Sequence, residues 1–287
     1  MRMGRPSTLR AAETRPSSGR LRARRPGRVR LGALCLALIA LPARSMDEYG
    51  GGWAVPSLDT AVSIGNAALD HELQLSVLRG GRGRDRGVGG GADGAGFFAA
   101  ALGARAARVR PAAVETSFRR SRAVETQAHA NILAALRKRQ PEAAAEYRRL
   151  FATADLPAGF EDVLRPYGLR ADDAADTLAA YWVMAWVVAR RIADDSGLPS
   201  PQAVRAVREQ VVQGLALGPT GNYDATRRQM LADETIFDFL VLNQAWRAAR
   251  HEPAQFERLA TATRNNFLAL GADLDRLDLG RGGFVVQ

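Results

Sequence analysis

Cysteine is nearly absent from this chain of 287 residues: its only copy is Cys35, inside an apolar run near the N-terminus. A disulfide within one chain needs two cysteines, and the common structural zinc sites use several thiolates. Beyond that run, the sequence therefore excludes disulfides, thiolate nucleophiles and cysteine metal sites. Stability has to come from an apolar core, for which the rest of the chain is long enough.

Histidine and the familiar catalytic motifs are also scarce. His71, His129 and His251 are the only histidines, no two stand at helical spacing, and no HExxH is present. A zinc site would have to gather its ligands from distant parts of the chain. No serine lies in a G-x-S-x-G or S-x-x-K motif. The sequence therefore predicts no metal and no cofactor.

Surplus positive charge is missing from most of the chain, although the formal net charge is +10. The first 45 residues contain 11 of the 40 basic residues and one of the 30 acidic ones, which leaves 29 of each sign in the remainder. A nucleic-acid-binding surface needs an excess of positive charge. We therefore expect no nucleic-acid partner.

The N-terminal segment, residues 1–45, has the three parts of a secretory signal peptide. Arg20–Arg30 is rich in arginine, and Leu31–Pro42 is a twelve-residue apolar run. Small residues occupy the −3 and −1 positions of a cut between Ser45 and Met46. The sequence thus predicts cleavage at this point and a periplasmic or secreted protein.

Two other interpretations of this leader remain open. A membrane anchor needs about 20 apolar residues, whereas this run reaches only about 18 Å as a helix. We therefore expect no stable membrane span after cleavage. Arg24 and Arg25 would allow twin-arginine export in place of the general secretory route, but Pro26 and Gly27 follow where such signals carry hydrophobic residues.

Composition divides the rest of the chain into three parts. Residues 46–79 are a short arm followed by a predicted helix from Pro56 to Arg79. Residues 80–96 are rich in glycine and arginine, cannot bury a core and are expected to be a flexible linker. Residues 97–287 show a helical pattern almost to the end, without a useful alternating strand pattern. The predicted fold is all-α, an irregular bundle of about six helices.

Prolines and glycines mark where the helices of this bundle begin and end. Pro111–Arg139 predicts a long helix on the outside, because it has many charges and few large apolar residues. The tail, Leu274–Val286, is expected to be extended and docked on the body. Further helices are predicted over Pro141–Phe151, Pro157–Tyr167, Pro201–Leu217 and Glu252–Leu270, and one that begins at Asn222 or Asp224 and runs to about Arg250.

The strongest predicted helix spans residues 172–193. Its first turn carries Asp172, Asp173 and Asp176, and two arginines end it, which complements the helix dipole. The thirteen residues Thr177–Ala189 have no polar face, which predicts burial on every side at the centre of the bundle. They are too few to cross a bilayer. The aspartates lack the spaced oxygens of a calcium loop, so the dipole explains them better.

Carboxylates are the only candidates left for catalysis. Glu234 and Asp238 lie one helical turn apart, and Arg227 falls on the same face. Glycosidases use two carboxyl groups at a fixed separation, so a cell-wall or glycan hydrolase is one hypothesis, with Arg227 tuning the acids. The other interpretation is structural: Arg227, or an arginine from another helix, holds one of the acids in an ion pair.

Four aromatic residues are candidates for lining a ligand pocket: Tyr181, Trp182, Trp186 and Trp246. Each combines a large apolar surface with a polar tip, as pocket residues do. Packing in the helical core explains the same spacing, and the pattern favours it.

The helical region also contains three groups of short motifs. They are Tyr181-Trp182 with Trp186 after an aspartate-rich helix start, Gln229 with Ala232-Asp233, and Leu270-Gly271-x-Asp273-Leu274 followed by Gly283-Phe284. Together they resemble a bacterial family of exported, all-helical proteins, which is defined only as a domain of unknown function. The resemblance covers residues 111–287. It implies export and a helical fold, and it assigns no activity to any residue.

Three functional hypotheses follow. Because no motif for a nucleophile, metal or cofactor is found, the first is an exported, non-catalytic binding protein of the bacterial envelope, whose partner is an envelope protein or a small ligand. The second is the hydrolase that uses Glu234 and Asp238. The third is a subunit of an envelope complex, tethered through the Pro56–Arg79 helix and the linker.

Overall fold

The computed structural model describes residues 114–139, 141–217 and 222–287. The predicted signal peptide and its cut, the helix at 56–79 and the linker at 80–96 lie outside these residues. All the described residues belong to a single unit of the chain.

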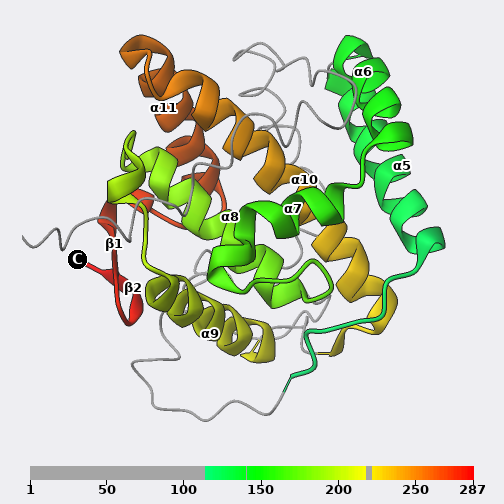
Figure 1. Cartoon of the computed structure of the whole chain (residues 1–287), viewed down its shortest axis with the longest axis horizontal. Helices are drawn as coiled ribbons and strands as arrows, with labels where there is room; N and C mark the ends of the chain where they lie inside the picture. The colour runs from blue at the N-terminus through cyan, green and yellow to red at the C-terminus, as the bar shows by residue number, and fades with distance from the viewer. Residues whose placement is uncertain (1–113, 140, 218–221) are drawn as a thin grey trace, which may run out of the picture. The chain divides into compact units, whose positions relative to one another are not determined.

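The described residues are mostly helical, as the sequence predicts, and include seven α-helices (Figure 1). About six were predicted, and a small two-stranded sheet is added at the C-terminus. Short 3-10 turns precede α8, α9 and the sheet. The elements are α5 (Arg122–Arg139), α6 (Pro141–Thr153), α7 (Leu156–Leu164), α8 (Ala174–Ala189), α9 (Pro201–Leu217), α10 (Ala225–Ala249), α11 (Pro253–Ala269), β1 (Leu277–Gly280) and β2 (Gly283–Val286).

Helix α8 is buried along its length. Fifteen of its 16 residues are buried, and only Trp186 is partly exposed. Asp173 starts the helix, because its carboxylate accepts hydrogen bonds from the backbone N–H groups of Ala175 (2.9 Å) and Asp176 (3.2 Å). Helices α9, α10 and α11 all pack against α8. This burial agrees with the apolar pattern of the sequence.

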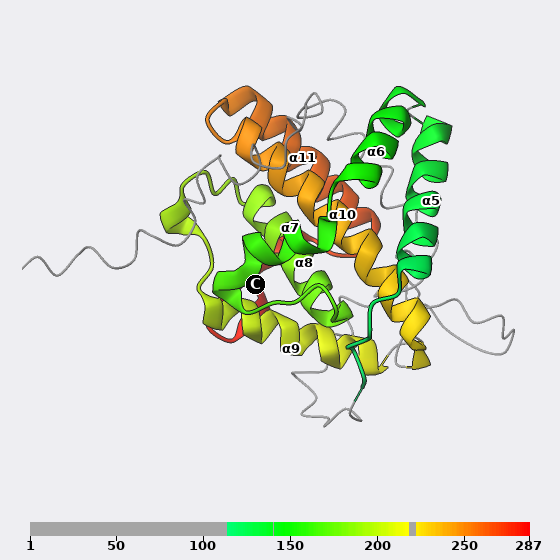
Figure 2. The same ribbon diagram turned by 45° about the vertical axis from the view of Figure 1, so that its right-hand side comes forward.

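Helix α10 is the longest described helix and packs against α5, α7, α8 and α11 (Figures 1 and 2). Asp224 starts it by accepting a hydrogen bond from the backbone N–H of Arg227 (2.8 Å). Because several helices surround α10, three of its carboxyl groups are buried: those of Asp233, Glu234 and Asp238. Burying a carboxyl group is costly unless it is paired, hydrogen-bonded or protonated.

Residues 114–121 are extended, so the prediction that a helix runs from Pro111 is wrong here. The backbone N–H of Phe118 donates to the carbonyl of Asp172 (2.9 Å), and that of Ala174 donates to Thr116 (2.9 Å). These bonds pair the segment with the chain at the start of α8, where backbone N–H groups lack helical partners. Pairing with α8 therefore replaces the first turns of the predicted helix.

Helix α5 lies at the side of the described body, as its many charges predict (Figures 1 and 2). Ala128, Ile132, Leu133 and Leu136 are buried, and α5 packs against α10 and α6. Spaced three and four residues apart, these side chains form a narrow apolar stripe. The stripe buries one face of α5, while the charged residues occupy the other face.

The C-terminal tail is extended and docked, as predicted, and folds into the antiparallel hairpin β1–β2. Gln210 of α9 holds strand β2 of this hairpin. The amide Nε2 of Gln210 donates to the carbonyl of Phe284 (2.8 Å), and its Oε1 accepts from the N–H of Phe284 (2.8 Å). Gly283 permits this approach, because a Cβ there would overlap the amide of Gln210. Its φ of 92° also favours glycine.

Candidate functional site

Both predicted catalytic acids have their side chains in the interior. Glu234 is 2% exposed and Asp238 is 4% exposed. Their neighbours come from different helices: Glu234 accepts a hydrogen bond from Asn131 of α5, whereas Asp238 lies close enough to Tyr181 of α8 to affect its titration. Both carboxyl groups therefore lie in the packed interior, and neither is an exposed acid.

Burial dominates the chemistry of Glu234. The loss of water around the carboxyl raises its pKa from the usual 4.5 to about 8. The hydrogen bond from Asn131 acts in the opposite direction, and the neighbouring Asp233 adds to the rise. No hydrogen-bond partner within the described residues reaches its Oε2 atom. Glu234 is therefore mostly protonated at neutral pH.

An arginine outside α10 does pair with a carboxylate of this helix, as the structural interpretation predicts, but its partner is Asp233 and not Glu234. Nη2 of Arg120 contacts Oδ1 of Asp233, and Nη1 of Arg120 donates to the carbonyl of Ala171 (3.0 Å). Burial raises the pKa of Asp233, while Arg120 lowers it. Sequence reasoning missed this pair because its members lie 113 residues apart, and Arg120 sits in the unexpected extended segment.

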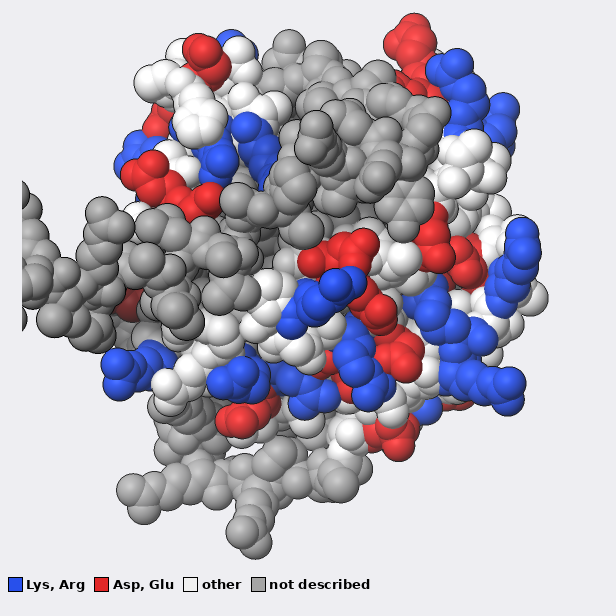
Figure 3. Space-filling model, viewed as in Figure 1, with Lys and Arg blue, Asp and Glu red and all other residues white. Residues whose placement is uncertain are grey.

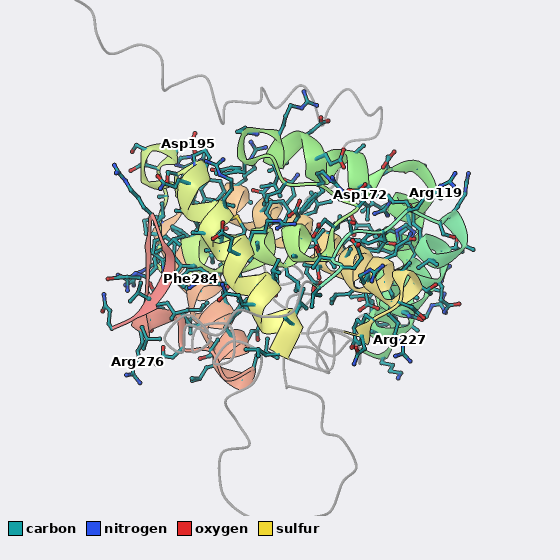
Figure 4. The ribbon with its side chains drawn as sticks, turned by 90° about the horizontal axis from the view of Figure 1, so that it is seen from below. Arg119, Asp172, Asp195, Arg227, Arg276 and Phe284 are labelled. Atoms are coloured by element: carbon teal, nitrogen blue, oxygen red, sulfur yellow. The ribbon has the colours of Figure 1, made fainter. Side chains whose placement is uncertain are left out.

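Arg227, predicted to tune or hold the two acids, is exposed in the first turn of α10. Its guanidinium lies 5.8 Å from the centre of the Tyr223 ring. Figure 4 shows Arg227 and Arg119 on the side of the described body opposite to Phe284. Burial along α10 begins only at Gln229, two residues after Arg227, so this side chain does not follow Glu234 into the interior.

Gln229, one of the motif residues, clamps the segment that precedes α5. Its Oε1 accepts from the N–H of Ser121 (2.7 Å), and its Nε2 donates to the carbonyl of the same residue (2.8 Å). Gln210 holds Phe284 in the same way. A glutamine amide can do this because it offers one acceptor and two donors, much like the edge of a strand. The structure therefore gives this motif residue an architectural role.

The aspartates at the start of α8 form a network with an arginine. Oδ2 of Asp173 accepts from Thr116 (2.9 Å) and from Nη2 of Arg208 (3.0 Å), while Oδ1 of Asp176 contacts Nε of the same arginine. Burial and the nearby Asp173 raise the pKa of Asp176, and Arg208 opposes the rise. A guanidinium thus supplies the positive charge here. The described part of the chain contains no group of three or more His, Cys, Asp or Glu residues that could hold a metal.

Two of the predicted pocket aromatics bind backbone carbonyls. The indole N–H of Trp186 donates to Leu277 of β1 (2.8 Å), and that of Trp246 donates to Ile192 (2.8 Å). Arg250 lies over the Trp246 ring, 4.6 Å from its centre. These tryptophans therefore fasten the chain after α8 and the C-terminal hairpin to the helices.

The other two aromatics lie deeper in α8. Trp182 is 1% exposed, and Tyr181 packs its ring 5.5 Å from that of Phe267 on α11. Burial raises the pKa of Tyr181 well above its usual value, and the charge of Asp238 adds to the effect. The four predicted aromatics thus take part in the packing of the described chain, two in the core and two against the segments outside the helices.

Opposite charges are mixed over the visible described surface in Figure 3, with arginines and carboxylates side by side. The described residues carry 22 basic and 22 acidic side chains. None of their helices is both long and apolar enough to cross a membrane. No family model, curated protein or solved structure matches this chain. Its function has to be argued from the geometry above.

Proposed function

We propose that the protein is an exported, non-catalytic binding protein of the bacterial envelope. The observation that carries the proposal is the interior position of the acids that would do chemistry. Glu234 and Asp238 of α10 are almost fully buried. A catalytic acid has to come within hydrogen-bond reach of its substrate. Their burial supports a structural role.

Export is proposed from the leader sequence and from the resemblance to exported helical proteins. In this arrangement a cleaved leader, an N-terminal helix and a glycine-rich linker precede an irregular bundle around α8. Fractionation of cells, followed by mass spectrometry of the mature N-terminus, tests it. We expect a periplasmic or secreted protein that starts at Met46. A cytosolic protein with an uncut leader would contradict the proposal.

Apolar side chains on the surface offer places where a partner could bind. Leu217, Leu268, Val285 and Val286 are each at least half exposed. Larger groups of such residues commonly mark interaction sites. A photo-crosslinking residue at Leu268 or Val285 should form an adduct in the envelope fraction, whereas the same residue at the exposed Ala145 of α6 should not. No adduct at either site, or equal adducts at all three, would count against binding there.

The hydrolase remains a second candidate because one observation favours it. A pKa of about 8 keeps Glu234 protonated at neutral pH, as a general acid requires. The purified protein should be incubated with isolated cell-wall sacculi beside its Glu234→Gln and Asp238→Asn variants. We expect no soluble fragments from any of them. Fragments released by the wild type and lost in both variants would establish the hydrolase instead.

The tethered-subunit hypothesis makes a separate prediction. Deletion of residues 46–96 should abolish association with an envelope complex while the circular dichroism of the remaining chain stays unchanged. Unchanged association would exclude this hypothesis without affecting the binding proposal.

A further inference from the structure

Helices α5 and α6 form a hairpin attached to one side of the described body. Figures 1 and 2 show the two helices side by side next to α10. Among the described elements, their main contacts outside the hairpin are between α5 and α10. Tyr147 of α6 meets Phe237 of α10 edge to face, with ring centres 5.1 Å apart. One seam therefore holds the hairpin to the rest of the described chain.

Glu234 lies in this seam. Asn131 of α5 donates to its carboxyl and also approaches Sδ of Met230 (3.6 Å). Within the described residues, Oε2 of Glu234 has no hydrogen-bond partner. Ile132, next to Asn131 on α5, and Ile236, two residues after Glu234 on α10, are both fully buried. A buried carboxylate without a cation beside it is strongly disfavoured, so an ionised Glu234 needs water.

We propose that the α5–α6 hairpin is a pH-dependent clasp, docked on α10 while Glu234 carries its proton and released more readily once Glu234 loses it. Release brings water to the carboxylate and uncovers the aromatic pair Tyr147 and Phe237. The apolar surface under the hairpin is then exposed more often at higher pH and becomes available for binding. The inference goes beyond the proposed function and does not depend on export.

Other titratable groups face the seam from the hairpin, and they keep one charge state through the relevant range. On α5, burial lowers the pKa of His129 below its usual 6.5 although Glu125 opposes the shift, so His129 is neutral above pH 6.5. On α6, burial and Glu146 raise the pKa of Tyr147 above its usual 10, so the phenol stays neutral. Neither group changes charge between pH 6.5 and 9.

The remaining charged groups at the seam are already paired. Asp233 of α10 contacts the guanidinium of Arg120, which comes from the extended segment before α5. Arginine stays protonated throughout this range. Glu234, with a pKa of about 8, is therefore the group that titrates in the seam near neutral pH.

The size of the effect follows from proton linkage. The docked hairpin binds the proton of Glu234 with a pKa of about 8, and the released hairpin binds it with the usual 4.5. Between these values the equilibrium constant for release rises about tenfold per pH unit, and above about 8 it levels off. From pH 6.5 to the plateau above pH 8, release should therefore increase about thirtyfold.

Hydrogen exchange of the full chain, read by mass spectrometry from pH 6.5 to 9.5, tests this directly. Each rate is divided by the chemical rate at the same pH to give a protection factor. Once released, short helices are marginal in water and exchange quickly. Protection of Arg122–Thr153 should fall about thirtyfold and then level off. Ala174–Ala189 in the core helix α8 exchanges through global unfolding, so its protection should stay well above that of the hairpin at every pH.

Substitutions assign the effect to one carboxyl. Glu234→Gln keeps the shape without a charge and should make protection of the hairpin independent of pH. Glu142→Gln, at an exposed position on α6, should behave as the wild type does. If the glutamine variant fails to fold, Glu234→Met provides a second uncharged side chain of similar length. The proposal is overturned by flat protection of the hairpin in the wild type or by a fall that persists in the Glu234 variants. It is also overturned if the hairpin is as strongly protected as α8 at every pH, because the hairpin would then open only when the whole fold does.

Discussion

Replacing Glu234 with glutamine should stabilise the protein, and the gain should grow with pH. Glutamine has the shape of the protonated acid and can keep the hydrogen bond from Asn131 through its carbonyl oxygen. The pKa of Glu234 is about 8 in the folded chain and 4.5 in an ordinary setting. Between these values the folded protein holds a proton that the unfolded chain releases. The wild type therefore loses stability as the pH rises through this interval, and no further above it.

The two pKa values set the magnitude. One pKa unit corresponds to about 1.4 kcal/mol, so glutamine should add about 1 kcal/mol to the free energy of unfolding at pH 5. The gain should reach about 3 kcal/mol at pH 7 and about 5 kcal/mol at pH 9. Release of the α5–α6 hairpin before global unfolding would limit the gain to the free energy of docking.

Urea denaturation of the full chain, followed by far-ultraviolet circular dichroism at these three pH values, measures the gain. Glu142→Gln serves as the exposed control and should change stability by less than about 0.5 kcal/mol. The reasoning fails if Glu234→Gln has the same effect at every pH, or if it destabilises the protein at pH 9. Either result would mean that the carboxylate of Glu234 is solvated or paired in the folded chain.

Three further predictions concern the contacts that fix the architecture. Gln210→Ala leaves the buried N–H and carbonyl of Phe284 in β2 unpaired, so urea denaturation should show a loss of about 2–4 kcal/mol in the free energy of unfolding. The control Gln202→Ala, at an exposed position of α9, should cost less than about 0.5 kcal/mol. Equal costs would show that Gln210 does not hold the strand. Asp173→Ala removes the N-cap of α8 and one partner of Arg208, so the free energy of unfolding in the same assay should fall by about 3 kcal/mol or more. A fall of less than about 1 kcal/mol would show that this network contributes little to stability. Arg191 has a left-handed φ of 56°, so Arg191→Gly should be about 1 kcal/mol more stable than Arg191→Ala by thermal unfolding, and equal melting temperatures would contradict strain at this position.

Local signals in the sequence were enough to predict most of the helices. Asp173 and Asp224 start α8 and α10 as caps, and Gly271, with a φ of 86°, follows the end of α11. These boundaries depend on residues within one turn of the helix end, so they can be read from the sequence. The burial of α8 follows in the same way from a run without a polar face.

The extended segment before α5 could not be predicted, because distant residues determine it. Its backbone pairs with the start of α8, and Gln229 binds both backbone groups of Ser121 from 108 residues away. Most residues of 114–118 have only moderate helix propensity, so tertiary hydrogen bonds decide the conformation of this segment. The sheet is a similar case, because Phe284 of β2 is held by Gln210, which lies 74 residues earlier in the chain.

The candidate site was predicted in part. Spacing placed Glu234 and Asp238 on one helix, and their burial could be anticipated from the apolar residues around them. Spacing alone does not identify the partners of these two acids, and it does not show that Arg120 pairs with the neighbouring Asp233. Arg227 was assigned to the acids by its helical phase alone. Phase does not indicate where burial begins along a helix, and α10 becomes buried only after that residue.

The central claim is that the acids of α10 belong to the packed interior and not to an open catalytic pair. The side-chain carboxyl of Glu234 can be followed directly by carbon-13 NMR as a function of pH, with its signal assigned by its loss in Glu234→Gln. The account predicts a midpoint near pH 8. A midpoint near the usual 4.5 would show a carboxylate in contact with water, and would contradict both the buried seam and the clasp built on it.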